Sequence, residues 1–134
     1  MMTIIVMLFA AIEPGIAQGA QETGSEGLDV YRDPDRLREL IEDPPAVFLL
    51  VDVRAKAEYL VGHIPGAIHV PYDEIAANPP TDDTDALIIL YCQSGVRSGR
   101  AERSLRSMGY TRVLDWGGIV DWPYQRVTGP DPHG

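Results

Sequence analysis

The residues best suited to chemistry form one short segment, residues 92–98 (CQSGVRS). Cys92 is the single cysteine of the chain, so it forms no internal disulfide, and any importance it has lies in thiol reactivity. A continuous apolar run precedes it and a helical pattern follows it. In that position backbone N–H groups converge on a small anion. The same donors and the helix dipole favour the thiolate, which lowers the pKa of a cysteine.

The rest of the segment suits an anion cradle. Gly95 permits a tight turn that brings backbone amides close to a ligand. Arg97 carries a permanent positive charge on a planar fork; it either binds substrate oxygens or braces the loop against a carboxylate. An inert core cysteine is the alternative for Cys92, but a glycine and two serines make poor core neighbours. Ser98 is placed to cap the helix. The candidate substrate-binding residues are Gln93, Ser94, Gly95, Val96, Arg97 and Ser98.

Strand-length apolar runs alternate with helical patterns along the chain. Residues 47–53 (VFLLVDV) and 86–91 (ALIILY) are continuously apolar, as expected for strands buried on both faces. Shorter strand candidates are residues 28–31, 67–70 and 112–114. One helix begins at Pro34 with Asp33 as its cap and ends at the Pro44-Pro45 pair. Residues 98–108 form a second helix that Gly109 ends, residues 72–77 make a helical turn, and a short helix follows Gly118.

This alternation predicts a parallel sheet covered by helices on both faces. In such sheets ligands bind beyond the carboxyl ends of the strands. Cys92 directly follows a predicted strand, so the rule places the reactive segment at the binding edge.

Four motifs in order resemble the rhodanese family. The segment 92–98 resembles its active-site loop, a cysteine, four residues and an arginine. Residues 52–54 (DVR) with Glu58 and Tyr59, residues 62–68 (GHIPGAI), and residues 116–118 (WGG) with Trp122 resemble its other motifs. The resemblance covers about residues 28–122 and implies a five-stranded parallel sheet with helices on both faces.

The resemblance also implies a sulfurtransferase reaction. A cysteine thiolate attacks the outer sulfur of thiosulfate, sulfite leaves, and the persulfide passes its sulfur to cyanide or a thiol. Such a displacement needs a thiolate, an anion cradle and room for an acceptor. Cys92 would supply the thiolate. No metal or organic cofactor is required. The expected partners are a small-molecule donor, thiosulfate or a related persulfide, and a thiol or cyanide acceptor.

Other motif residues are expected to support the site rather than react. Asp52 and Arg54 lie at the end of a buried strand, and Arg54 can pair with Glu58. His63 is expected to brace a turn, and Trp116 and Trp122 to pack. His69 lies at an alternating strand position with no partner evident from the sequence.

Two further functions compete with this interpretation. A phosphatase or arsenate reductase of the same fold carries five residues between Cys and Arg, enough to ring a larger oxyanion; the interval here is four. The other is a carrier or binding module that holds a persulfide for a partner protein.

The chain ends differ from the centre. The apolar run 4–12 is too short to span a bilayer and suits a secretory signal, residues 1–17, cleaved after Ala17. No Lys or Arg precedes that run. The expected organisation is a signal, a linker at residues 18–27, one domain at residues 28–124 and a C-terminal tail at residues 125–134. A cleaved protein would be periplasmic or secreted, without stable membrane insertion; the alternative is cytoplasmic.

The length and the net charge of the chain limit the number of domains and the kinds of binding partner. A chain of 134 residues is one domain by the usual length prior. Its net charge of -9 argues against nucleic acid and anionic membrane surfaces, which need clustered positive charge. A small anion can still bind in a local positive pocket. The oligomeric state does not follow from the sequence.

Overall fold

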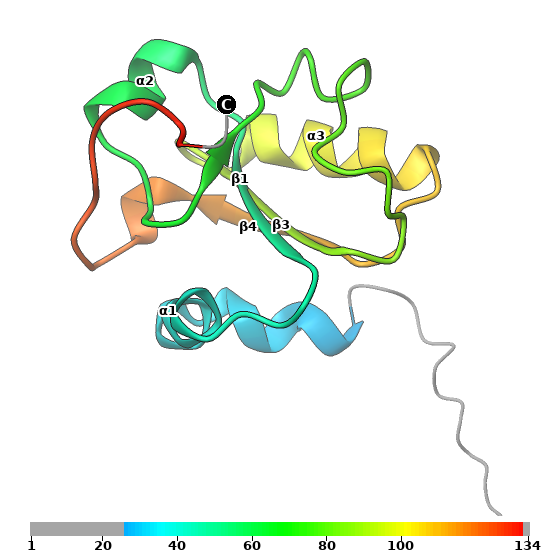
Figure 1. The fold of residues 1–134 in the computed structure, drawn as a ribbon, viewed down its shortest axis with the longest axis horizontal. Helices are drawn as coiled ribbons and strands as arrows, with labels where there is room; N and C mark the ends of the chain where they lie inside the picture. Colours follow the sequence, from blue (N-terminus) through cyan, green and yellow to red (C-terminus); the bar gives the residue numbers. More distant parts are fainter. Residues whose placement is uncertain (1–25, 133–134) are drawn as a thin grey trace, which may run out of the picture.

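A computed structural model describes residues 26–132 as four parallel strands with helices around them (Figure 1). The strand order is β2-β1-β3-β4. The α/β class with a parallel sheet is as predicted, but the expected five strands are four. The strands are β1 (Phe48–Asp52), β2 (Ile68–His69), β3 (Leu87–Cys92) and β4 (Val113–Gly118).

The missing strand is a helix. Residues 28–31, expected to be extended, lie in the 3-10 helix η2 (Glu26–Arg32). Leu28 is buried and Val30 is exposed, so the inward side chain recurs at Tyr31, three residues on, which is the period of a 3-10 turn. The indole of Trp116 donates to the carbonyl of Tyr31, and Arg32 donates to the carbonyl of Asp115. These bonds hold η2 against β4 rather than beside the sheet as another strand.

The two predicted helices are present. α1 (Pro34–Glu42) begins as expected, with the Asp33 carboxylate accepting from the backbone N–H of Asp35. α3 (Val96–Ser107) begins two residues earlier than predicted, because Gly95 and not Ser98 is the cap residue. Gly109, with φ of 100°, follows the end of α3.

The remaining helical segments of residues 26–132 are one turn and two short helices. The turn 72–77 is present, and η3 (Ile119–Asp121) is the short helix expected after Gly118. α2 (Lys56–Val61) was not predicted, although Glu58 accepts from the N–H of Ala55 at its start, a recognisable beginning for a helix.

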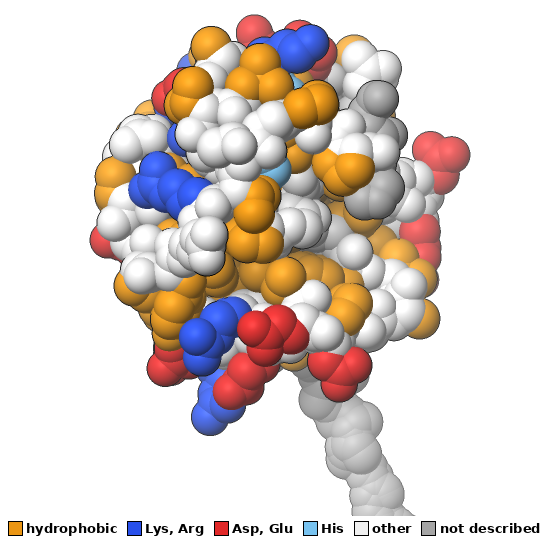
Figure 2. Space-filling view, turned by 60° about the vertical axis from the view of Figure 1, so that its left-hand side comes forward, with side chains coloured by type: hydrophobic (Ala, Val, Ile, Leu, Met, Phe, Trp, Pro, Cys, Tyr) orange, Lys and Arg blue, Asp and Glu red, His pale blue; other side chains and the backbone are white. Residues whose placement is uncertain are grey.

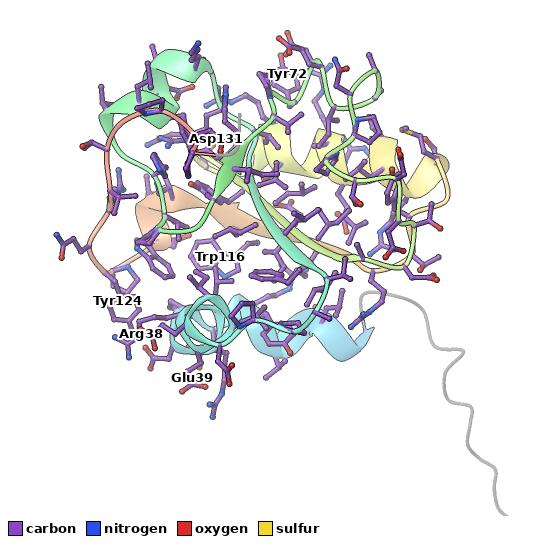
Figure 3. All side chains as sticks on the ribbon, viewed as in Figure 1. Arg38, Glu39, Tyr72, Trp116, Tyr124 and Asp131 are labelled. Carbon is purple, nitrogen blue, oxygen red and sulfur yellow. The ribbon has the colours of Figure 1, made fainter. Side chains whose placement is uncertain are left out.

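The core lies on both faces of the sheet. On one face η2 and α1 pack against β1, β3 and β4, and the opposite face carries α3 (Figure 1). Along β3 the side chains alternate between the two clusters, Leu87, Ile89 and Tyr91 facing one and Ile88, Leu90 and Cys92 the other. Trp116 lies between the sheet and α1, with its ring 6.2 Å from that of Trp122 (Figure 3). Both tryptophans are buried and pack, as predicted.

The segment 125–132, expected to be a tail, is attached to the domain. Val127 and His63 exchange backbone hydrogen bonds of 2.8 and 2.9 Å, and the N–H of Gly129 donates to the carbonyl of Leu60.

The face turned toward the viewer in Figure 2 carries hydrophobic side chains among charged ones of both signs. Within residues 26–132, no helix is long and apolar enough to cross a membrane. The expected signal, residues 1–17, lies outside the described residues.

Candidate active site

Cys92 ends the fully buried strand β3, and its sulfur receives hydrogen bonds from the loop that follows. The backbone N–H of Gly95 donates to Sγ at 2.9 Å, and the Ser98 hydroxyl donates at 3.4 Å. Cys92 is 1% exposed. The loop therefore curls back over the sulfur, with its N–H groups turned inward as an anion cradle requires.

These donors change the acidity of the thiol. Burial by itself raises the pKa of Cys92, because it disfavours the charged form. The hydroxyl and N–H of Ser98 and the N–H groups of Gly95 and Ser94 stabilise the thiolate, and together they outweigh burial. The pKa of Cys92 is lowered overall, as expected for a nucleophilic cysteine.

Ser98 has a different role from the predicted one. It is buried inside the first turn of α3, where its hydroxyl contacts the sulfur and lies 3.2 Å from the carbonyl of Gly95 and 3.3 Å from that of Gly117. The helix begins instead at Gly95, whose φ of 108° is in the left-handed region that favours glycine. Ser98 therefore supports the thiolate and joins the loop to β4.

The end of β4 supports the loop from beneath. A Cβ built on Gly118 would lie 2.4 Å from the carbonyl oxygen of Gln93 and 2.7 Å from the Cα of Ser94. Gly118 pairs with Cys92 in the sheet, so the loop backbone rests directly on the strand. This contact was not predicted from the sequence; a glycine pair within a strand, which marks a close backbone approach, was the available signal.

Arg97 braces the loop against a carboxylate. Its Nη1 donates to Glu58 Oε1 at 2.7 Å and its Nη2 to Oε2 at 3.1 Å. The hydrogen bond from Arg97 is the largest cause that lowers the pKa of Glu58, to about 2. Of the two roles left open for Arg97, the described structure contains the brace, and Glu58 is its partner.

Arg54 pairs with Asp52 and not, as expected, with Glu58. Its Nη2 lies 2.7 Å from Asp52 Oδ2, with both side chains buried, and also donates to the carbonyl of Gly62 at 2.7 Å. The spacing explains the error: Asp52 Oδ1 accepts from the N–H of Arg54, which folds the arginine back onto the strand end. Burial, followed by the charge of Asp52, raises the pKa of the neighbouring Tyr91. The hydroxyl of Tyr91 accepts from the N–H of Ile64.

The two described histidines are held in the scaffold. His63 is buried; its Nδ1 lies 2.8 Å from the carbonyl of Tyr59, and its ring stacks on the Tyr59 ring with centroids 3.7 Å apart. This is the turn-bracing role predicted for it. His69 has a partner that the sequence did not reveal, since its Nε2 lies 2.8 Å from the carbonyl of Arg54. Both side chains therefore position backbone at the carboxyl edge of the sheet.

The fold and the site together define one class of α/β domain: a parallel sheet that carries a cysteine, surrounded by N–H donors, at its carboxyl edge. A family model described as a rhodanese-like domain matches residues 33–123, and the chain belongs to that family. A solved rhodanese with anions from Escherichia coli is 35% identical, with a TM-score of 0.53, over 61% of this chain and 99% of that one.

Relatives of this chain include sulfurtransferases and tRNA uridine(34) hydroxylases. A thiosulfate:glutathione sulfurtransferase of Saccharomyces cerevisiae is 34% identical over 117 residues, which cover 77% of this chain and 84% of that protein. A tRNA uridine(34) hydroxylase of Erwinia tasmaniensis is 32% identical over 116 residues, 80% of this chain. The chain spans about a third (33%) of the length of that hydroxylase. The sequence similarity therefore extends over 84% of the sulfurtransferase but over only 33% of the hydroxylase.

Proposed function

We propose that the protein transfers sulfane sulfur from thiosulfate, or a related persulfide donor, to cyanide or a thiol through a persulfide on Cys92. The observation that carries the proposal is the pair of hydrogen bonds to the Cys92 sulfur from Gly95 and Ser98. Such hydrogen bonds lower the pKa of the thiol and raise the fraction present as thiolate, which is the nucleophile. The yeast relative, whose name gives both a thiosulfate donor and a thiol acceptor, covers most of this chain and supports the same chemistry.

The reaction divides into two displacements at sulfur. The Cys92 thiolate forms a bond to the outer sulfur of thiosulfate while the donor S–S bond breaks, and sulfite leaves with the electron pair. The acceptor then attacks the outer sulfur of the Cys92 persulfide, and the Cys92 thiolate is the leaving group. The N–H of Gly95 and the hydroxyl of Ser98 stabilise negative charge on Cys92 at both ends of the cycle, so they assist the departure of the thiolate as well as its formation.

The test is the intact mass of the purified protein. Thiosulfate is expected to add one sulfur atom, and cyanide is expected to remove it as thiocyanate. Cys92→Ser, which keeps the size of the side chain and removes the sulfur nucleophile, is expected to abolish both steps. Thiocyanate production that survives in Cys92→Ser would refute the proposal.

A carrier that holds the persulfide for a partner protein is the second candidate. Its support is that related sequence also forms about a third of longer enzymes, the tRNA uridine(34) hydroxylases. A carrier gives the same mass increase with thiosulfate but turns over slowly with cyanide and small thiols. Steady-state turnover with glutathione, compared with the single-turnover loading rate, distinguishes the two.

We also propose that residues 1–17 direct export to the periplasm. The support is the apolar run 4–12 followed by the small residues Gly15 and Ala17. Fractionation of the native host with N-terminal sequencing tests this proposal. A mature chain that begins at Gln18 supports it, and a soluble cytoplasmic chain that begins at Met1 contradicts it.

A further inference from the structure

The carboxylate of Glu58 is fixed beside the active-site loop by three hydrogen bonds. Oε1 accepts from the N–H of Ala55 at 2.9 Å, at the start of α2. Both carboxylate oxygens also accept from Arg97, which lies in the first turn of α3. The exposed fractions of the Arg97 and Glu58 side chains are 28% and 35%, so the pair lies at the border between the domain interior and solvent. If the Glu58 side chain moved away from Arg97, it would therefore also lose the hydrogen bond from Ala55 at the start of α2.

The pair cancels the positive charge of the loop. Arg97 is the one basic residue in residues 92–98. The hydrogen bond from Arg97 keeps the pKa of Glu58 at about 2, so the carboxylate is ionised throughout the neutral range. Arg54, a second arginine whose field reaches Glu58, is itself matched by the buried carboxylate of Asp52. Arg97 and Arg54 thus each have a carboxylate partner that offsets their charge.

This balance matters for the charge of the donor. An anion approaching Cys92 is attracted by backbone N–H groups and repelled by a protein of net charge -9. Thiosulfate carries two negative charges. The Coulomb energy with any fixed charge is proportional to the ligand charge, so Glu58 opposes a dianion about twice as strongly as a monoanion.

We propose that Glu58 is a specificity-determining residue, which neutralises Arg97 and thereby favours sulfane-sulfur donors with a single negative charge, of the thiosulfonate class (R–SO₂–S⁻), relative to thiosulfate. The inference rests on the proposed function, because it concerns the donor of the same site. With a thiosulfonate, the Cys92 thiolate bonds to the outer sulfur, the donor S–S bond breaks, and the sulfinate R–SO₂⁻ leaves with the electron pair. No proton, oxidant or reductant is consumed.

The test compares thiosulfate with methanethiosulfonate, which offers the same outer sulfur with one charge less. Glu58→Gln removes the charge; its single amide oxygen can still accept from Ala55 and from Arg97 Nη1, while the bond from Arg97 Nη2 is lost. The measured quantity is the ratio of kcat/KM for thiosulfate to kcat/KM for methanethiosulfonate, with cyanide as acceptor. Any change in the reactivity of Cys92 affects both donors and cancels in this ratio. The ratio is expected to rise about threefold in Glu58→Gln, mainly through the KM for thiosulfate.

Two variants serve as controls. Glu102→Gln removes the same charge from another ion pair of α3, with Arg106, further along the helix from the loop, and is expected to leave the ratio unchanged. Glu58→Asp keeps the charge on a shorter side chain and is also expected to keep the wild-type ratio. An unchanged ratio in Glu58→Gln, or an equal rise in Glu102→Gln, overturns the inference. A loss of transfer from both donors without a change in the ratio makes Glu58 a structural brace and overturns it as well.

The salt dependence of the ratio provides a second measurement. Salt screens repulsion at a partly exposed site. The net charge of -9 by itself makes the thiosulfate to methanethiosulfonate ratio rise with sodium chloride, so the salt dependence of the wild type is compared with that of Glu58→Gln. If Glu58 cancels Arg97, the ratio rises less steeply with salt in Glu58→Gln than in the wild type; an equal salt dependence in the two proteins contradicts the inference. Failure of the proposed function looks different from either result, since the wild-type protein would then gain no sulfur from thiosulfate or methanethiosulfonate.

Discussion

Gly118→Ala is expected to displace the active-site loop without altering any residue in it. The backbone of Gly118 has φ of -114° and ψ of 141°, which alanine adopts freely. The cost therefore comes from the new methyl group, which would lie 2.4 Å from the carbonyl oxygen of Gln93 and 2.7 Å from the Cα of Ser94. Ordinary contact begins at 3.4 Å, so the strand and the loop must separate by about 1 Å.

That displacement affects the hydrogen bonds on which the thiolate depends. The loop carries the Gly95 N–H, 2.9 Å from the Cys92 sulfur, so a shift of about 1 Å breaks or misdirects this bond. A misplacement of that size can cost about a hundredfold in rate. Overpacking is expected to cost roughly 1–3 kcal/mol of stability. The rate of thiosulfate:cyanide transfer and the thermal midpoint Tm measure the two effects on the same protein.

Gly117→Ala is the matched control. Gly117 has φ of 111°, which strains an L residue by about 1–3 kcal/mol, but a Cβ at this position would have no neighbouring atom within 4 Å. The substitution is expected to lower Tm comparably while kcat/KM falls less than about threefold. If Gly118→Ala retains the wild-type kcat/KM at a similar loss of Tm, the contact between β4 and the loop has no part in positioning Cys92, and the reasoning is refuted.

Three other substitutions test the environment of the site. Ser98→Ala removes a donor to the thiolate, so the midpoint of the pH dependence of alkylation by iodoacetamide is expected to move upward; an unmoved midpoint contradicts the hydrogen bond to Cys92. Arg54→Ala leaves the carboxylate of Asp52 buried without its partner and is expected to cost about 3–5 kcal/mol in urea unfolding, whereas a loss below about 1 kcal/mol would argue against the buried pair. Glu58 has a folded pKa of about 2 against 4.5, so its stabilisation is present above about pH 4.5 and is lost as the pH falls toward 2; the Tm difference between wild type and Glu58→Gln should vanish over that range.

The local features of this fold are readable from the sequence because their causes are local. The runs around β1 and β3 are continuously apolar, which requires burial on both faces. Asp33 and Pro34 begin α1 through groups within two residues of each other. Cys92 between a buried strand and a helix specifies both the reactive atom and the edge of the sheet where it lies.

The errors occur where a contact distant in sequence determines the structure. Residues 28–31 have too few side chains to distinguish a strand from a 3-10 helix, and bonds from Trp116 and Arg32 to backbone 83–85 residues away decide for the helix. Arg54 has two carboxylates within four positions, and only the fold of the strand end selects Asp52 over Glu58.

The sequence by itself determined the chemical class of the site: one thiol, followed by a glycine, an arginine and two serines, at the carboxyl end of a buried strand. The tertiary structure decided how these groups act. It directs Arg97 toward Glu58, directs the Ser98 hydroxyl toward the sulfur, and sets the loop on Gly118. The physical reason is that hydrogen bonding and charge balance depend on distances of a few ångströms between residues that are distant in sequence. Arg97 and Glu58 are 39 residues apart, and Ser98 and Gly117 are 19 residues apart, so they meet only in the folded domain.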